Sequence, residues 1–500
     1  MTLACVQSRA LLGLAAPAVT VEVHLANGLP SLSLVGLADV EVKEARERVR
    51  CALQNSGLEF PNNKRITVNL APADLPKDSG RFDLPIALGI LAASGQIPLE
   101  ALHGWEFAGE LSLSGALRPV RGGLVSSLHG GDQRLVLPLD SAREAALAPA
   151  AQVFGAAHLL DVVAHLLGQP GGEGWQRITA QAPVHRASGP DLADVKGQVQ
   201  AKRALEIAAA GGHGLLLVGP PGAGKSMLAQ RFSSLLPAMT EQEALESAAV
   251  ASLAGRFVPQ ETAPRETSAP HHTASAVALV GGGSPPRPGA ISLAHHGVLF
   301  LDEFPEFARS ALEALREPLE NGHITIARAA LSSQFPARFQ LLAAMNPCPC
   351  GFHGSTQRPC RCSPQQIGRY QGKLSGPLLD RIDLHVHVPA LPAQELLQAP
   401  TGESSAAIRQ RVVQARQRAV ARQGGANQQL HGQQLEAVLQ LEPAAHALLH
   451  KAAERLAWSA RATHRTLRVA RTIADLAGGE GIASAHVAEA IQYRNVLLKN

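Results

Sequence analysis

Residues 214–226 read GLLLVGPPGAGKS, an apolar run that continues into the pattern G-x-x-x-x-G-K-S. The run of leucines predicts a buried strand, and the glycines predict a tight turn into a helix. Gly219, Gly222 and Gly224 allow the backbone to curl so that its N–H groups face a polyphosphate. This stretch therefore predicts a strand–loop–helix unit that binds phosphate groups.

A second apolar strand ends in two carboxylates at residues 298–303, VLFLDE. Lys225 suits the outer phosphates of a nucleotide, while Ser226 and Asp302 suit Mg²⁺. Glu303 suits polarisation of an attacking water. The two motifs together predict hydrolysis of a nucleoside triphosphate, with ATP and Mg²⁺ as ligands. The predicted nucleotide-binding residues are Gly219, Pro220, Pro221, Gly222, Ala223, Gly224, Lys225, Ser226 and Asp302.

The chain divides into four parts by composition and periodicity. We predict an α+β domain at residues 1–170, a glycine- and proline-containing linker at 171–190, an α/β core at 191–393 and an all-helical domain at 394–500. In the core, strands that alternate with helices predict a parallel sheet covered on both faces. The fold class is thus multidomain.

Individual elements of the first and last parts can be predicted as well. Residues 19–25 and 65–72 indicate strands, and residues 42–57 and 84–95 indicate helices that end at glycines. Residues 406–420 have apolar side chains at helical spacing with arginines around them.

The overall composition is that of a soluble globular protein, with 46% hydrophobic and 17% charged residues and a net charge of +4. Aromatic residues make up only 3%, which argues against a single-strand platform built on stacked rings. Residues 401–500 carry 13 Lys and Arg against 7 Asp and Glu. This basic segment indicates either a polyanionic partner or a solvated helix face. The apolar stretch 10–19 is too short to span a membrane and lacks signal-peptide flanks, so we expect a cytoplasmic protein without a membrane partner.

Four of the six cysteines form the pattern C-x-C-x₉-C-x-C. Cys348, Cys350, Cys360 and Cys362 suit a tetrahedral, structural Zn²⁺ site, although the C-x-C pairs are tighter than usual. The alternatives are reduced loop cysteines or a redox pair. The histidine pairs 271–272 and 295–296 are interpreted as polar contacts in loops near the nucleotide rather than as metal ligands.

Three further side chains are candidate catalytic groups. Asn346 ends an apolar strand and could hold the water or the γ-phosphate; an ordinary strand-end asparagine is the alternative. Arg381 could reach the γ-phosphate of a neighbouring subunit, or could merely pair with Asp380 or Asp383. Arg468 lies on a helix with arginines every three to four residues and could lean over the nucleotide; a solvated basic face is the alternative.

A β-hairpin is predicted at residues 320–339, where two alternating runs flank a polar centre. Such a hairpin could project into the pore of a ring and touch a threaded polymer. A surface hairpin without this role is the alternative.

Several segments together resemble one family, the magnesium-chelatase-like AAA+ ATPases of the YifB/ComM type. They are PHHTAS (270–275), GGGSPPRPGAISLAHHGVLFLDEFPEF (281–307), FPARFQLLAAMNPCPCG (335–351) and SGPLLDRIDLHV (375–386). The resemblance implies a homohexameric ring and a DNA helicase that promotes branch migration during natural transformation. Ala290 and His296 stand where relatives usually have Glu and Asn.

The resemblance also implies roles for individual residues. Residues 219–226 match the P-loop, and Asp302 and Glu303 match the Walker B carboxylates. Asn346 matches sensor 1. Arg381 matches the arginine finger, which acts on a neighbour, and Arg468 matches sensor 2, expected to act within its own subunit.

The N-terminal part resembles the Lon-protease/ribosomal-S5-like fold. In this resemblance Arg81 occupies the position of the nucleophilic serine and Val125 that of the lysine. A serine–lysine dyad needs both groups, and the nearby Ser79 has no evident base, so we expect a degenerate, non-peptidase domain.

The preferred interpretation is an ATP-driven motor that acts on single-stranded or branched DNA. The alternatives are a magnesium-chelatase-like motor subunit, a protein-remodelling ATPase or protease, and a regulator in which ATP only switches assembly.

Overall fold

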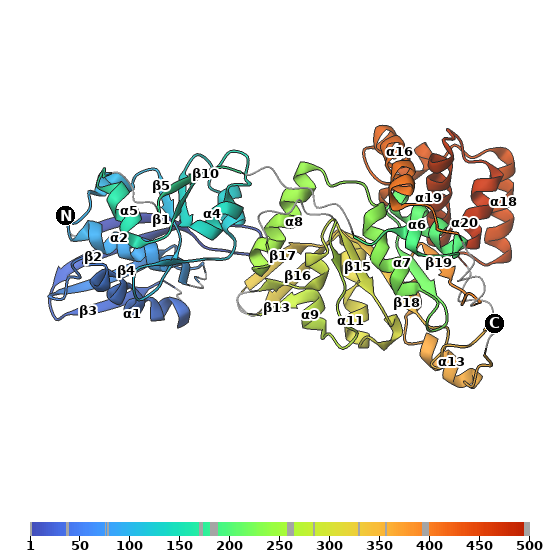
Figure 1. The fold of residues 1–500 in the computed structure, drawn as a ribbon, viewed down its shortest axis with the longest axis horizontal. Helices are drawn as coiled ribbons and strands as arrows, with labels where there is room; N and C mark the ends of the chain where they lie inside the picture. Colours follow the sequence, from blue (N-terminus) through green and yellow to red (C-terminus); the bar gives the residue numbers. More distant parts are fainter. Residues whose placement is uncertain are drawn as a thin grey trace.

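The computed structural model describes residues 3–36, 40–75, 77, 80–169, 174–180, 189–257, 265–283, 286–328, 331–355, 358–392 and 400–494. An N-terminal sheet domain lies at one end of an elongated molecule and a bundle of helices at the other, with an α/β core between them (Figure 1). Within these residues no helix is long and apolar enough to cross a membrane.

The N-terminal domain is a mixed sheet with helices, as the sequence predicted. Its strands pair in the order β10-β9-β8-β5-β1-β2-β4-β3. Alternate residues of β1 and β2 are buried under α2, which is apolar all round and fully buried. The bounds are β1 Leu3–Arg9, β2 Ala18–Asn27, β3 Ser31–Val35, β4 Lys64–Ala71, β5 Trp105–Phe107, β8 Arg134–Pro138, β9 Gln152–Ala156, β10 Gln176–Ile178, α1 Val40–Asn55, α2 Asp83–Ala93, α3 Gly123–Leu128, α4 Leu139–Ala145 and α5 Leu159–Leu166.

One segment of the predicted linker belongs to this sheet instead. β10 pairs antiparallel with β9, and the ring of Trp175 stacks on His165 at 4.2 Å and on Phe154 at 5.4 Å. The linker prediction was wrong here because one large aromatic side chain anchors an otherwise glycine-rich stretch. Residues 170–173 and 181–188 of the predicted linker lie outside the described residues.

The core is a five-stranded parallel sheet with the order β12-β15-β18-β11-β19. Its strands are β12 Thr267–Ser268, β15 Val298–Leu301, β18 Gln340–Met345, β11 Leu215–Val218 and β19 Leu384–His387. Leu215 and Leu217 pack in one apolar cluster with α6 (Val199–Gly211) and the C-terminal helices, while Leu216 and Val218 pack in another on the opposite face. Burial on both faces explains the continuous apolar runs of these strands.

Shorter elements surround this sheet. They are α7 Lys225–Phe232, α8 Glu241–Ala254, α9 Ala276–Val280, α10 Ala290–Leu293, α11 Arg309–Ala314, α12 Arg316–Asn321, α13 Pro364–Gln371, α14 Gly376–Leu379 and the short strands β13 Gly281–Gly282 and β14 Arg287–Pro288. The predicted hairpin is confirmed as β16 (His323–Arg328) and β17 (Leu331–Pro336), paired from His323 with Pro336 to Arg328 with Leu331. Its base is anchored by buried Ile324, Ile326 and Phe335.

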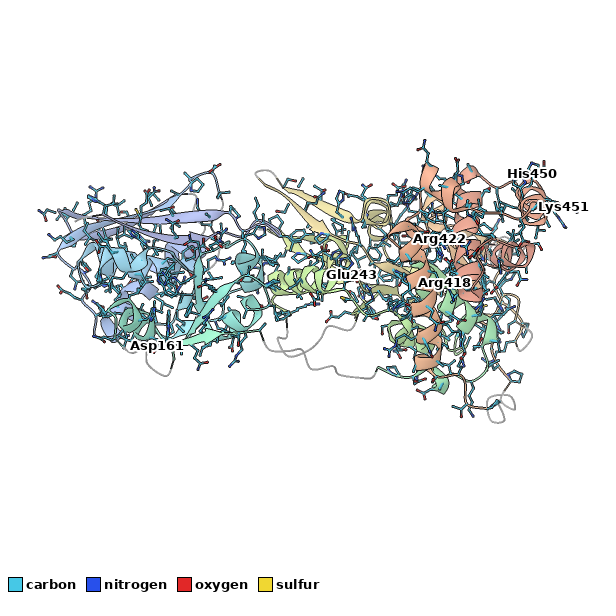
Figure 2. The ribbon with its side chains drawn as sticks, turned by 90° about the horizontal axis from the view of Figure 1, so that it is seen from above. Asp161, Glu243, Arg418, Arg422, His450 and Lys451 are labelled. Atoms are coloured by element: carbon cyan, nitrogen blue, oxygen red, sulfur yellow. The ribbon has the colours of Figure 1, made fainter. Side chains whose placement is uncertain are left out.

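The C-terminal region is helical, as predicted, with α16 Ser405–Gln423, α17 Gly432–Val438, α18 Pro443–Arg455, α19 Ala460–Ala477 and α20 Ser484–Gln492. The arginines of α16 mostly bind protein groups: Arg416 donates to carbonyls of α6, and Arg418 and Arg422 donate to Asp475 of α19. Figure 2 shows Arg418 and Arg422 on this helix. The excess positive charge of this segment is therefore largely engaged within the fold.

The N-terminal domain is attached to the core through α8. The carboxylate of Glu144 accepts hydrogen bonds from the Ser252 hydroxyl (3.0 Å) and from the Gly123 N–H (2.6 Å). Leu124 and Val125 of α3 lie in the same apolar cluster as Leu253 of α8. The described residues on both sides thus form a packed, hydrogen-bonded contact.

Candidate nucleotide site

The glycine-rich loop leaves β11 at the carboxyl end of the sheet. Gly222 and Gly224 have φ values of +75° and +91°, a conformation that other residues rarely adopt. The loop leads into α7, whose first N–H groups have no partner within the helix. A helix N-terminus with free N–H groups attracts a phosphate.

Lys225 is buried at the first position of α7. Its ammonium group donates to the carbonyls of Gly219 (2.7 Å) and Pro220 (2.9 Å) and to Oδ1 of Asn346 (3.1 Å). Burial lowers the pKa of Lys225, and Asp302 opposes this effect. The ammonium is held mainly by neutral acceptors, so a phosphate would supply the missing negative charge.

Ser226 and Asp302 meet in the same place, since Ser226 Oγ donates to Asp302 Oδ2 at 2.6 Å. A hydroxyl next to a carboxylate is the pair of oxygen ligands that suits Mg²⁺ beside a nucleotide. The residues at this position therefore fit the predicted metal.

Glu303 follows Asp302 in a left-handed backbone conformation, with a φ of +51°. Its N–H donates to Asp302 Oδ1 (2.9 Å), and its Oε2 lies 2.8 Å from Nδ1 of His272. The carboxylate thus points away from its own backbone toward the loop before α9. His272 was expected to be a polar contact near the nucleotide, and it contacts the carboxylate that we predicted to act on water.

The four clustered cysteines lie directly beyond Asn346. The Sγ of Cys348 is 3.4 Å from that of Cys350 and 3.7 Å from that of Cys360, and the last two are 3.5 Å apart. All four Sγ atoms, including that of Cys362, lie within 4.8 Å of one another. A tetrahedron with Zn–S bonds of about 2.3 Å has edges of about 3.8 Å, whereas a disulfide requires about 2.05 Å. The three Sγ–Sγ distances are close to the edges of such a tetrahedron and are too long for a disulfide.

This cysteine loop packs on the phosphate-binding loop. A Cβ on Gly351, whose φ is +85°, would lie 2.7 Å from Cγ of Pro221. The side chain of Gln371 in α13 donates to the carbonyl of Pro347, next to Cys348. The cysteine loop is therefore in van der Waals contact with the candidate nucleotide site.

Arg381 and Arg468 lie at the other end of the sheet. Arg381 precedes β19, donates to the carbonyl of Pro377 and pairs with Glu320. Arg468 donates to the carbonyl of Gln428 (3.0 Å), and its nearest charged groups include Asp383. Arg468 was expected to reach the nucleotide of its own subunit; it lies beside Asp383 at the amino edge, whereas Lys225 lies at the carboxyl ends of the strands.

A buried hydrogen-bond chain holds Arg468 at this amino edge. His213 contacts Asp383 (3.0 Å) through Nδ1 and Thr472 (2.8 Å) through Nε2. Thr472 is one turn beyond Arg468 on α19 and donates to its carbonyl. The chain ties the start of β11, the start of β19 and α19 together.

The second histidine pair binds a carboxylate of α8. His296 Nε2 lies 2.7 Å and His295 Nε2 3.3 Å from Oε2 of Glu246. The backbone N–H of Arg338 donates to His295 Nδ1 (3.1 Å), so a neutral His295 carries its proton on Nε2. A metal at Nε2 would leave this ring without a proton on either nitrogen. In metal-binding histidines the other ring nitrogen usually carries a proton and donates it to a neighbouring acceptor. The pair forms polar contacts, as expected. Figure 2 labels Glu243, which lies on α8 as Glu246 does.

In the N-terminal domain, Arg81 is buried and donates to Ser126 Oγ at 2.8 Å. Val125 is buried in the contact with α8. Ser79 lies outside the described residues. Among the described residues, positions 81 and 125 therefore present an arginine and an apolar side chain to the domain contact.

One residue near the nucleotide site was missed from the sequence. The buried side chain of Gln198 donates to the carbonyls of Ala223 (3.1 Å) and Pro389 (2.7 Å), which joins the phosphate-binding loop to the end of β19. Its left-handed backbone, with a φ of +51°, directly follows Gly197, a local turn signal that could have drawn attention to this position.

Comparison with known proteins gives three family matches. They are described as magnesium chelatase, subunit ChlI (residues 191–396), subunit ChlI of Mg-chelatase (21–140) and magnesium chelatase, subunit ChlI C-terminal (402–494).

Individual relatives match over nearly the whole chain or over part of it. The sequence is 50% identical over 500 residues to the competence protein ComM of Haemophilus influenzae, covering 99% of this chain and 98% of that protein. It is 47% identical over 500 residues to the uncharacterized protein YifB of Escherichia coli K12, with the same coverage. Over 133 residues it is 30% identical to the maternal DNA replication licensing factor mcm3 of Xenopus laevis, covering 27% of this chain and 14% of that protein.

Proposed function

Because this chain belongs to the magnesium-chelatase-like family of the YifB and ComM type, we propose that it is an ATP-driven AAA+ motor that acts on DNA. The observation that carries the proposal is the convergence of Lys225, Ser226, Asp302 and Asn346 at one edge of the sheet. The match to a protein named for competence favours DNA as the substrate, and the partial match to a replication licensing factor points the same way.

In the proposed mechanism, the loop at residues 219–224 and the start of α7 bind the phosphates through backbone N–H groups. Lys225 moves from its carbonyl partners to the outer phosphates. Ser226 and Asp302 hold Mg²⁺, which neutralises charge on the phosphates when bound. Glu303 accepts a proton from the attacking water, and Asn346 orients that water or the γ-phosphate.

We further propose that the site is completed by a second subunit. Arg381 and Arg468 lie at the edge opposite their own Lys225, so both would act on the nucleotide of a neighbour. An arginine supplied in this way stabilises charge in the transition state. A closed homohexameric ring places the amino edge of each core against the carboxyl edge of the next.

The cysteine cluster supports a structural Zn²⁺ held by Cys348, Cys350, Cys360 and Cys362, each as a thiolate. Four thiols this close together persist in a reducing compartment, so we propose a cytoplasmic location. We propose that the N-terminal domain is a non-peptidase assembly module, because Arg81 and Val125 replace the groups of a dyad. The proposed division is a first domain that includes β10 and so ends beyond residue 178, a core at residues 191–393 and a helical domain at residues 394–500.

ATP turnover with and without DNA tests this function. We expect single-stranded or branched DNA to stimulate turnover by the purified protein, and Glu303→Gln to abolish it. Turnover that is robust but indifferent to DNA would favour the alternative, a chelatase-like or protein-remodelling motor, in which the same site drives a different partner.

A further inference from the structure

The contact between His272 and Glu303 is not used by the mechanism above. We propose that His272 is a positioning residue that fixes the water-activating carboxylate of Glu303 and links it to the β16–β17 hairpin. This inference rests on the proposed ATP hydrolysis and adds a residue and a route of regulation to the same site.

The Glu303 side chain depends on His272 for its orientation. The side chain is 55% exposed, so solvent alone would leave it free to change rotamer. Its backbone is fixed by the N–H bond to Asp302, and His272 Nδ1 holds Oε2 at 2.8 Å. Oε1 stays available to accept a proton from water. A base held in one orientation is the geometry that general-base catalysis requires.

The neighbouring His271 differs from His272 in its contacts. Its Nδ1 lies 2.9 Å from the Thr273 hydroxyl, and its ring centroid lies 4.1 Å from that of His272, with the two ring planes tilted by 34°. Two adjacent histidines of the same loop thus have different partners, only one of which is a proposed catalytic group. His271 therefore provides a matched control for His272.

A short chain of elements connects His272 with the hairpin. The loop turns through a bond from the Ala274 N–H to the His271 carbonyl, and Ser275 then caps α9 by accepting from the Ala278 N–H. At the end of α9, a Cβ on Gly281 would lie 2.9 Å from Cδ1 of Ile326 in β16. Movement of the hairpin base would therefore press on α9.

The same helix is anchored beneath by Leu279, which is fully buried in the apolar cluster that contains Ile324, Ile326 and Phe335. Packed interiors transmit displacement rather than absorb it. A polymer that displaces the hairpin would thus change the position of His272 and, through it, the orientation of Glu303. The route predicts that loss of His272 weakens the response to DNA as well as basal turnover.

The test compares His272→Ala, His272→Asn, His271→Ala and Glu303→Gln in the full-length protein, with a fluorescent ATP analogue for affinity and phosphate release for turnover. We expect His272→Ala to lower kcat roughly 10- to 100-fold, with nucleotide affinity within about twofold, and to reduce DNA stimulation almost to none. His272→Asn keeps an N–H donor near the position of Nδ1 and should recover much of both. His271→Ala should behave as the wild type.

Three results would overturn the inference: normal kcat and stimulation in His272→Ala, a loss of affinity as large as the loss of kcat, or an equal defect in His271→Ala. If the wild-type protein does not turn over ATP, the proposed hydrolysis itself fails; if Glu303→Gln retains turnover, Glu303 is not the base and the inference about His272 fails with it. If Glu303→Gln is inactive while His272→Ala is normal, only the inference about His272 fails.

Discussion

The ammonium of Lys225 lies 3.1 Å from the side-chain oxygen of Asn346, 121 residues further along the chain. This contact joins the phosphate-binding loop to the end of the neighbouring strand β18. The cysteine loop begins two residues after Asn346 and packs on Pro221. The residues proposed for nucleotide binding, γ-phosphate sensing and zinc binding therefore share one small region.

Substitutions in the phosphate-binding loop and at the Walker B carboxylate should affect nucleotide binding and turnover separately. Lys225→Ala removes the charge that meets the phosphates, so nucleotide affinity should fall sharply. Glu303→Gln removes only the base, so affinity should remain near normal while kcat falls roughly 10²- to 10⁴-fold. Equilibrium titration with a fluorescent nucleotide and steady-state phosphate release measure the two quantities. Normal turnover in Glu303→Gln would mean that another group activates the water.

Subunit mixing should show that Arg381 and Arg468 act in trans. Arg381→Ala and Lys225→Ala should each be inactive alone, because every interface lacks one group. In an equal mixture, about a quarter of the interfaces combine an intact Lys225 with an intact Arg381, and activity should return in proportion.

The same mixture with Arg468→Ala decides where that arginine acts. At the amino edge it should complement Lys225→Ala in the same way. No recovery with Arg468→Ala, alongside recovery with Arg381→Ala, would restore the original expectation that Arg468 serves its own subunit.

The cysteine cluster should bind one zinc per chain and support the nucleotide site. Cys360→Ser should lose the metal and weaken ATP binding, because the loop that carries Gly351 rests on Pro221. Gly351→Ala keeps all four thiols, so it should weaken ATP binding without loss of zinc. Metal analysis and nucleotide titration separate the effects. Zinc well below one equivalent in the wild type would rule out the tetrahedral site.

His295, a buried histidine just before β15, should make the stability of the protein depend on pH. Burial, together with the neighbouring His296, lowers the pKa of His295 to about 4, below its usual value near 6.5. The unfolded chain therefore binds a proton between these values and the folded chain does not. The contribution of His295 to the free energy of unfolding should be fully present above pH 6.5. It should fall by about 2 kcal/mol between pH 7 and pH 5.

Urea unfolding at pH 7 and pH 5 measures this effect, with His295→Asn as the comparison. Asparagine cannot titrate, so the variant should be less stable at pH 7 but should lose less stability on acidification. An identical loss in both proteins would show that other groups dominate the pH dependence.

The sequence predicted the parallel core well because its strands are buried on both faces and their motifs stand at strand ends. Lys225, Ser226, Asp302 and Asn346 were expected together and are found together, since parallel strands place their carboxyl ends at one edge. The helical C-terminal region followed from periodicity alone.

Other features of the fold and the site could not be predicted, because they depend on tertiary contacts that local sequence patterns do not indicate. The strand β10 lies within a predicted linker because the ring of Trp175 packs against Phe154 and His165. Helix spacing does not reveal which end of the sheet α19 meets, so the sequence could not show that Arg468 lies at the amino edge. The His213–Asp383–Thr472 hydrogen-bond chain holds α19 at the amino edge of the sheet, and it joins residues up to 259 positions apart.

The most direct test of the central claim is strand displacement on branched DNA by the wild-type protein and by Glu303→Gln. The account predicts strand separation that requires hydrolysable ATP, is absent in Glu303→Gln and is accompanied by DNA-stimulated turnover. Active ATP hydrolysis that neither responds to DNA nor separates strands would contradict a DNA motor.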